Sequence, residues 1–147
     1  MWTKPKTDWT ANDFYNVEDY TRIRDNILWL KDLADNVLTF PAVITKSYTY
    51  DVPDLTPMAN KTVHDLPYPS VLNAIENNFA TINEYTHDLT DSRNTFVGNG
   101  TFITYTQLND LESKIQLLHD WLLNDMAGAS NLGFTLANDI SQKGLRV

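Results

Sequence analysis

A short pattern that occurs three times constrains this 147-residue chain more than any other feature of its sequence. The pattern Leu-Asn-x-Leu-Glu-x-x-Ile begins at Leu108, and a close copy begins at Leu72. A looser copy begins at Tyr20, with Thr21 and Arg24 in place of Asn and Glu. Because sequence repeats are the signature of an architecture built from one repeated unit, the pattern predicts three helices that share one packing scheme.

Each copy continues as a stripe of apolar residues separated by alternating steps of three and four, which is the heptad spacing of coiled coils. We therefore predict helices over about residues 16–38, 69–89 and 105–127. The stripes are expected to form the core or an oligomer interface. Their residues are Tyr20, Ile23, Ile27 and Leu30 in the first helix, Leu72, Ile75, Phe79 and Ile82 in the second, and Leu108, Leu111, Ile115, Leu118 and Leu122 in the third.

Polar residues and glycine mark the ends of these helices. Asn16 and Asp19 have the spacing of a capping box, and so do Thr104 and Gln107. Gly128 is expected to end the third helix, since glycine favours the left-handed conformation found after helix C-termini. Opposite its narrow stripe the second helix has a polar side, as expected for an outer helix of a small bundle. That side consists of Asn73, Glu76, Asn77, Asn83 and Glu84.

Extended segments are predicted outside the helices. Residues 1–15 form an N-terminal arm, and its Trp2, Trp9 and Phe14 are expected to dock on the same domain or on another subunit. Residues 42–69 form a long connection that contains four prolines, with a short strand at 43–50. Asn99-Gly100 is a strong signal for a two-residue hairpin loop, so residues 95–104 are predicted to be a β-hairpin. Residues 129–147 are expected to be a C-terminal appendage with a short helix at 136–142.

The predicted fold is therefore mainly α, with the helical domain at residues 16–128. We expect a three-helix up-down arrangement with coiled-coil-like stripes, a small β-hairpin and extended termini.

The charge of the chain restricts its partners. Nineteen acidic residues against eleven basic ones give a formal net charge of −8. Nucleic acid and anionic membrane surfaces are disfavoured, because both require clustered lysine and arginine. We expect no signal peptide, because residues 1–10 contain no apolar h-region. We expect no membrane span, because no apolar run approaches the roughly 20 residues that a bilayer requires.

The sequence offers little for catalysis. There is no cysteine, and His64, His87 and His119 do not have the His-x-x-x-His spacing of a helical metal site. Asp51 and Asp54 share a loop, but the glycine and terminal glutamate of an EF-hand are missing. We expect no cofactor, no metal and no enzymatic activity.

Two segments carry a resemblance to a known group of proteins. Residues 9–23, from Trp9 through Asn12, Asp13 and Asn16 to Ile23, resemble the opening of structural proteins in phages and prophages of Gram-positive bacteria. Residues 102–112 are similar to the strand-to-helix element that recurs in the tail, baseplate and fibre subunits of this group. The resemblance implies a virion structural subunit that oligomerises through helices and has no catalytic residues.

We therefore expect a non-enzymatic virion component, an oligomeric adaptor or appendage of a phage tail, neck or baseplate. It would be made in the host cytoplasm, would form a trimer or a higher ring, and would contact other virion proteins. A receptor- or glycan-binding module is the alternative, and it would present Trp2, Trp9 and loop tyrosines in a groove. A third hypothesis is that the chain is a small acidic regulatory or inhibitory protein.

Overall fold

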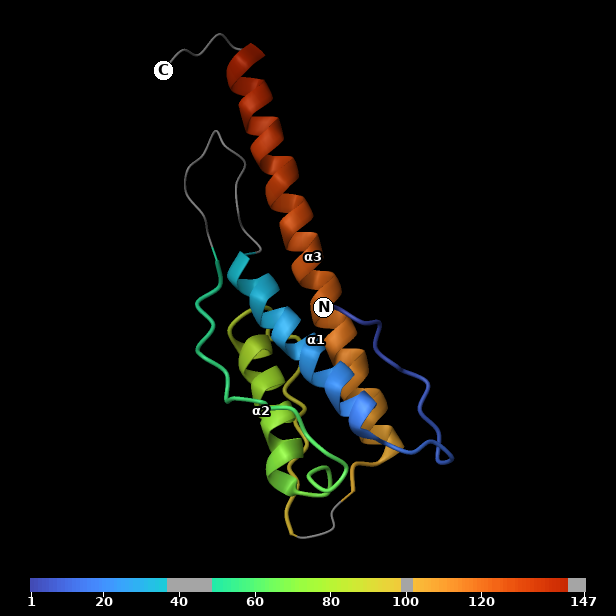
Figure 1. Ribbon diagram of the computed structural model, residues 1–147. Helices are drawn as coiled ribbons and strands as arrows, with labels where there is room; N and C mark the ends of the chain where they lie inside the picture. Colours follow the sequence, from blue (N-terminus) through green and yellow to red (C-terminus); the bar gives the residue numbers. More distant parts are fainter. Residues whose placement is uncertain (37–48, 99–101, 143–147) are drawn as a thin grey trace.

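Three helices form a parallel bundle in the computed structural model, which describes residues 1–36, 49–98 and 102–142, with side chains up to residue 127. The helices are α1 (Val17–Asn36), α2 (Pro69–Glu84) and α3 (Tyr105–Gln142), and each contacts the other two. All three run in the same direction, from the lower to the upper end of Figure 1. The predicted up-down arrangement is therefore wrong, because each connection is long enough to run back along the bundle before the next helix begins.

All three helices begin at the same position relative to their copy of the repeated pattern. Each starts three residues before the first residue of its copy, at Val17, Pro69 and Tyr105. The predicted capping box at α1 is confirmed, since the N–H of Asp19 donates to Asn16 Oδ1 and the N–H of Asn16 donates to Asp19 Oδ2.

The second capping box is confirmed as well. The N–H of Thr104 donates to Gln107 Oε1 at 2.9 Å, and the N–H of Gln107 donates to Thr104 Oγ1 at 3.3 Å. At the start of α2 no side chain caps the helix, and Pro69 occupies the first turn, where a missing N–H costs nothing.

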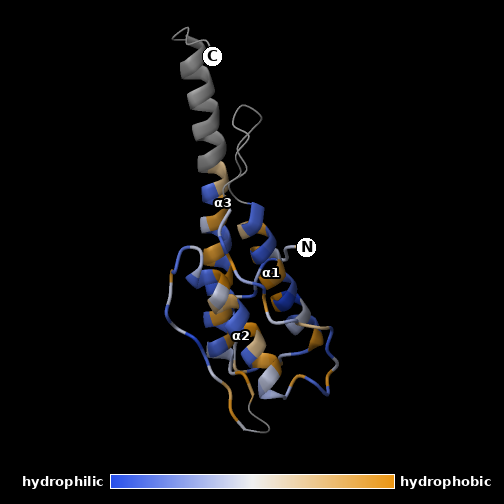
Figure 2. Cartoon of the chain, turned by 90° about the vertical axis from the view of Figure 1, so that its left-hand side faces the viewer, coloured by the Kyte–Doolittle hydropathy of each residue, from blue (hydrophilic) through white to orange (hydrophobic). Residues whose placement is uncertain are grey.

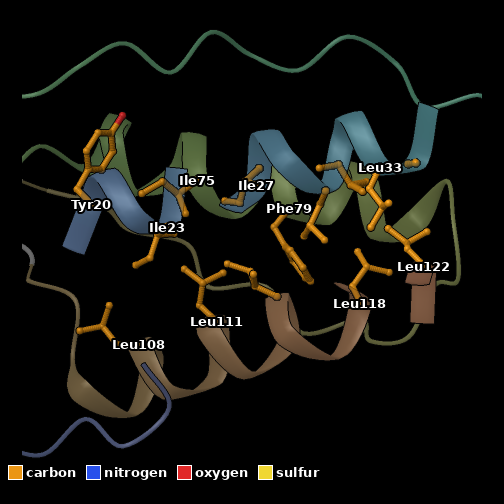
Figure 3. Close-up of a cluster of buried hydrophobic side chains, with 14 of the residues drawn as sticks. Tyr20, Ile23, Ile27, Leu33, Ile75, Phe79, Leu108, Leu111, Leu118 and Leu122 are labelled. Atoms are coloured by element: carbon orange, nitrogen blue, oxygen red, sulfur yellow. The ribbon is translucent and has the colours of Figure 1, made fainter. Parts of the chain in front are cut away.

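The apolar stripes meet between the three helices (Figure 3). Equivalent residues of the three copies form successive layers, and the first layer is made of Tyr20, Leu72 and Leu108, each at most 2% exposed. Along each helix, apolar and hydrophilic residues alternate in Figure 2, which is the pattern of a face that packs inward. Leu122 is the last residue of the α3 stripe that is fully buried in this core.

An extended segment precedes each helix and runs in the opposite direction to it. We refer to residues 1–16 as strap 1, residues 49–68 as strap 2, and residues 85–104 as strap 3, of which 99–101 are not described. Strap 1 begins near the middle of the bundle and runs down to its lower end (Figure 1). On the way it contacts α1 through Thr3 and α3 through Trp9. Burial of Trp9, Val52, Leu66 and Phe96 shows that the straps cover the core.

Two helix ends differ from the prediction. α2 ends at Glu84 and not near residue 89, because Asn83 turns the chain: its carbonyl accepts the N–H of Asp88, and its side chain bonds Leu89 and Thr90. α3 continues through Gly128 to Gln142 and so includes the predicted short helix. A glycine inside a helix costs only about 1 kcal/mol relative to alanine, which the flanking turns of a long helix tolerate.

The predicted β-hairpin at residues 95–104 is not supported. The described residues of this range, 95–98 and 102–104, form no strand, and the Asn99-Gly100 turn lies outside the described residues. The N–H and carbonyl of Phe96 bind a side chain of α2 in place of a neighbouring strand. The strand predicted at 43–50 also lies largely outside the described residues.

Candidate functional site

The most connected polar group of the bundle is Glu112 on α3, whose side chain is completely buried. Its Oε1 accepts hydrogen bonds from Arg22 Nη2 at 2.6 Å and from Trp9 Nε1 at 3.0 Å. Its Oε2 accepts from the N–H of Lys6 at 2.7 Å and from Arg22 Nε at 3.1 Å. Arg22 also donates to Asp19 Oδ1 at 2.8 Å. One buried carboxylate therefore joins strap 1, α1 and α3.

Asparagine at the second position of the pattern binds the backbone of a strap. The N–H of Trp9 donates to Asn109 Oδ1 at 2.8 Å, and Asn109 Nδ2 donates to the Trp9 carbonyl at 2.9 Å. In the same way, Asn73 accepts from the N–H of Phe96 and donates to its carbonyl, both at 2.8 Å. A side-chain amide thus replaces the neighbouring strand that an extended segment lacks.

The seventh position of the pattern binds a strap in all three copies. Each time, a side-chain nitrogen donates to the carbonyl of a Thr or Ser in the strap that precedes the same helix. The pairs are Asn26 with Thr3 at 2.7 Å, Asn78 with Thr56 at 2.8 Å, and Lys114 with Ser92 at 3.0 Å. In the two asparagine pairs, the amide oxygen also accepts the backbone N–H of the threonine, at 2.9 Å.

Glutamate at the fifth position binds the same strap as the asparagine at the second. Glu112 and Asn109 bind strap 1, whereas Glu76 accepts from Asn94 Nδ2 of strap 3 at 3.0 Å. Burial raises the pKa of Glu76, and its Oε2 has no hydrogen-bond partner among the described residues, with Lys114 Nζ 4.0 Å away. The polar side predicted for α2 is therefore partly buried, because strap 3 covers it.

The first copy, which lacks both Asn and Glu, binds strap 2 with other side chains. Tyr20 Oη donates to the Ala59 carbonyl at 3.0 Å, and Arg24 donates to Asn60 Oδ1. Strap 1 therefore lies between α3 and α1, strap 2 between α1 and α2, and strap 3 between α2 and α3. The three strap–helix repeats are related by a pseudo-three-fold axis.

A turn of the same design precedes α1 and α2 at the lower end of the bundle, which we call the base. Asp13 Oδ2 accepts from the N–H and hydroxyl of Thr10 at 2.7 and 3.0 Å, and Asp65 Oδ2 accepts from those of Thr62 at 2.8 and 2.9 Å. These hydrogen bonds lower the pKa of both aspartates, and the bond from the threonine backbone N–H has the larger effect in each case.

A pocket of about 340 Å³ opens between these turns, and we call it the base pocket. Pairs of residues at equivalent positions of the three repeats line it: Phe14 and Tyr15, Leu66 and Pro67, and Phe102 and Ile103. Asp13, Val63 and the first-layer residue Leu72 complete the lining. Phe14 and Phe102 are 87% and 75% exposed, so the rim is aromatic and open to solvent.

A polar cluster joins strap 2, the beginning of strap 3 and α3 toward the opposite end of the bundle. Asp125 Oδ2 accepts from Tyr50 Oη at 2.6 Å and lies 2.6 Å from His87 Nε2. Burial raises the pKa of Tyr50, and its hydrogen bond to Asp125 adds to the effect. The His87 ring is 5.0 Å from the ring of Trp121, which is 45% exposed.

The structure buries the predicted stripe residues but divides the residues predicted for the arm between the core and the surface. Every stripe residue from Tyr20 to Leu122 lies in the core of this single chain. Trp9 is buried, and Trp2 stacks on His119 with ring centroids 3.8 Å apart. Phe14 is exposed at the base.

The strap-binding residues were missed by sequence reasoning, although their recurrence at the second, fifth and seventh positions was a usable signal. Lys114 also forms an ion pair with Asp110, one helical turn earlier on α3, at 2.8 Å.

Comparison with known proteins found no matching family model, no matching curated protein and no matching solved structure. Among the residues that the structure describes, no group of three His, Asp or Glu side chains is placed to hold a metal ion. Within the same residues, no helix has the length and apolar character that crossing a bilayer requires.

Proposed function

We propose that this chain is a non-enzymatic structural subunit of a phage virion, an oligomeric adaptor or appendage of a tail, neck or baseplate. The observation that carries the proposal is a set of large apolar side chains that α1 and α3 leave exposed. Leu28 and Trp29 on α1 are 44% and 38% exposed, and Leu117, Trp121 and Leu123 on α3 are 41–48% exposed. Exposed apolar side chains that gather on a surface, aromatic ones in particular, are typical of protein–protein interfaces.

The division of labour among the side chains supports a scaffolding role. The buried polar groups Glu112, Asn26 and Asn78 hold straps against helices, so their hydrogen-bonding capacity is used within the fold. α3 is 38 residues long, against 20 for α1, and extends beyond the bundle (Figure 1). A helix that projects from a packed bundle is a suitable connector between subunits. The resemblance of residues 9–23 and 102–112 to phage structural proteins points to the virion.

Association in solution tests this proposal. Light scattering during size-exclusion chromatography should give a mass of three or more chains at concentrations of about 100 μM, a range in which interfaces of moderate affinity are occupied. The double variant Trp29→Ser, Leu117→Ser should shift this mass toward the monomer, whereas Asn77→Ser, an exposed polar site on α2, should not. A wild-type chain that stays monomeric at these concentrations contradicts the proposal.

A glycan-binding module is the second candidate, and Trp121 is the observation that favours it. Its half-exposed ring lies beside His87, and both are close to Asp125, a combination of aromatic surface and polar groups that suits a sugar. Trp9 is buried and one face of Trp2 stacks on His119, so the groove predicted for these two residues is not formed as expected. A glycan array with no binding, together with no change in Trp121 fluorescence on sugar addition, would remove this candidate.

A further inference from the structure

The base pocket is a formed apolar site that none of the residues described by the structure fills. Its volume of about 340 Å³ falls in the range of ligand pockets, and its six principal wall residues come from all three repeats. Phe14 and Phe102 stand at the rim almost fully exposed, where they cover none of the chain's own core. An occupant with aliphatic side chains would therefore bury aromatic surface that is now in water.

The charge at the base selects among occupants. Asp13 lines the pocket and Asp65 lies in the equivalent turn, and each is kept ionised by its threonine. Lys6 Nζ approaches Asp13 to 3.9 Å but bonds Asp8 at 2.9 Å. If two copies of the chain met with the base of one against the base of the other, these carboxylates would come together, which like-charge repulsion opposes. The suitable occupant is an apolar segment that carries positive charge.

Residues 143–147 of this chain have that composition. Their sequence, Lys-Gly-Leu-Arg-Val, contains two cations and two aliphatic residues and no acidic residue. They follow α3, which runs away from the base (Figure 1). At 1.5 Å per residue, the 38 residues of α3 span about 57 Å, so the segment cannot reach the base of its own chain.

We propose that the base pocket binds residues 143–147 of a second copy of this chain. Leu145 and Val147 supply aliphatic side chains to match the aromatic rim of Phe14 and Phe102, and Lys143 and Arg146 supply charge opposite to that of Asp13 and Asp65. The contact joins two different surfaces, so it is head-to-tail and generates a ring or an open row of copies. This inference rests on the proposed function, for which it supplies one specific subunit contact.

A labelled peptide of residues 136–147, titrated with the full-length protein by fluorescence anisotropy, tests the contact. We expect saturable binding that weakens by about tenfold or more with Phe14→Ser in the protein or Leu145→Ser in the peptide, because each removes a large apolar side chain from the interface. Binding should also weaken with added salt. Leu123→Ser is the matched control, because it removes an exposed apolar residue from α3 and not from the base.

Several results would overturn the inference: no binding of the peptide, equal binding of a scrambled peptide, or equal loss with Leu123→Ser and Phe14→Ser. Phe14 is exposed, so its substitution leaves the core intact, which circular dichroism verifies. Sedimentation of the full-length chain separates this inference from the proposed function. Association that is unchanged by both Phe14→Ser and Leu145→Ser overturns the head-to-tail contact while the oligomeric subunit stands.

Discussion

At the scale of single residues, Glu112 is the side chain that joins strap 1 to both α1 and α3. Glu112→Ala leaves the Arg22 guanidinium, whose side chain is 17% exposed, without its buried partner and leaves the Trp9 indole N–H unsatisfied. Loss of one partner of a buried ion pair costs about 3–5 kcal/mol. We expect a loss of that size in the free energy of unfolding, measured by urea denaturation.

A double variant shows how much of the lost unfolding free energy comes from the Arg22 charge that Glu112→Ala leaves without a partner. Glu112→Leu with Arg22→Met removes both charges and should recover only the part of the stability that the orphaned charge costs, because the N–H groups of Lys6 and Trp9 still lack their acceptor and Asp19 loses its partner. If Glu112→Ala costs less than about 1 kcal/mol, the network is not the main tie between strap 1 and the helices.

Glu76 gives the stability of the protein a defined pH dependence. Burial raises its pKa above the unfolded value of about 4.3. A carboxyl group that binds its proton more tightly when folded stabilises the fold below the unfolded pKa, and this stability is lost as the pH rises through the folded pKa. Glu76→Gln should therefore increase the free energy of unfolding at pH 7 by on the order of 1 kcal/mol and flatten its decline above pH 4.3.

Urea denaturation at several pH values from 4 to 8 measures both effects. Gln retains an oxygen that accepts from Asn94, so the variant changes the charge and leaves that contact in place. A Glu76→Gln protein that is less stable than the wild type at pH 7 would show that the distant Lys114 outweighs the burial cost.

At the scale of elements, the bond between a helix asparagine and a strap backbone is the repeated device. Asn73→Ala should cost about 1–3 kcal/mol, because it leaves the N–H and carbonyl of Phe96 without partners at the edge of the core. Amide hydrogen exchange of Phe96 should accelerate accordingly. Asn77→Ala, one helical turn away and exposed, is the matched control and should leave Phe96 protected. Equal protection in both variants would contradict the role of Asn73.

Helix starts were predictable because their signals are local. Asn16 with Asp19 and Thr104 with Gln107 form capping boxes from residues three apart, and no tertiary contact is needed to recognise them. Helix ends were less predictable. α2 ends where Asn83 binds residues of strap 3, and α3 passes both Gly128 and Gly133, because a glycine inside a helix costs only about 1 kcal/mol relative to alanine.

At the scale of the whole molecule, the bundle and the projecting part of α3 should be separable. Among the side chains that the structure describes, the fully buried layers end at Leu122, so a chain that stops after residue 127 keeps the described core and straps. We expect its thermal unfolding midpoint to change by less than about 4 °C, which corresponds to under 1 kcal/mol for a chain of this size. Circular dichroism on heating measures it.

The same truncation removes the segment that we propose for the base pocket, so it should also weaken self-association. A fall of the midpoint by more than about 10 °C would mean that α3 beyond residue 127 stabilises the bundle itself.

The sequence alone determined that three helices with equivalent apolar stripes pack together, because heptad spacing depends only on the order of residues along each helix. Stripe residues such as Ile27, Leu72 and Leu118 were assigned on that basis, and all are buried. The tertiary structure decided the direction of the helices and the partners of the straps. Spacing along a helix is the same for parallel and antiparallel neighbours, and bonds such as Glu112 with Lys6 join residues that are far apart in the chain. Such bonds form only once the straps lie between the helices.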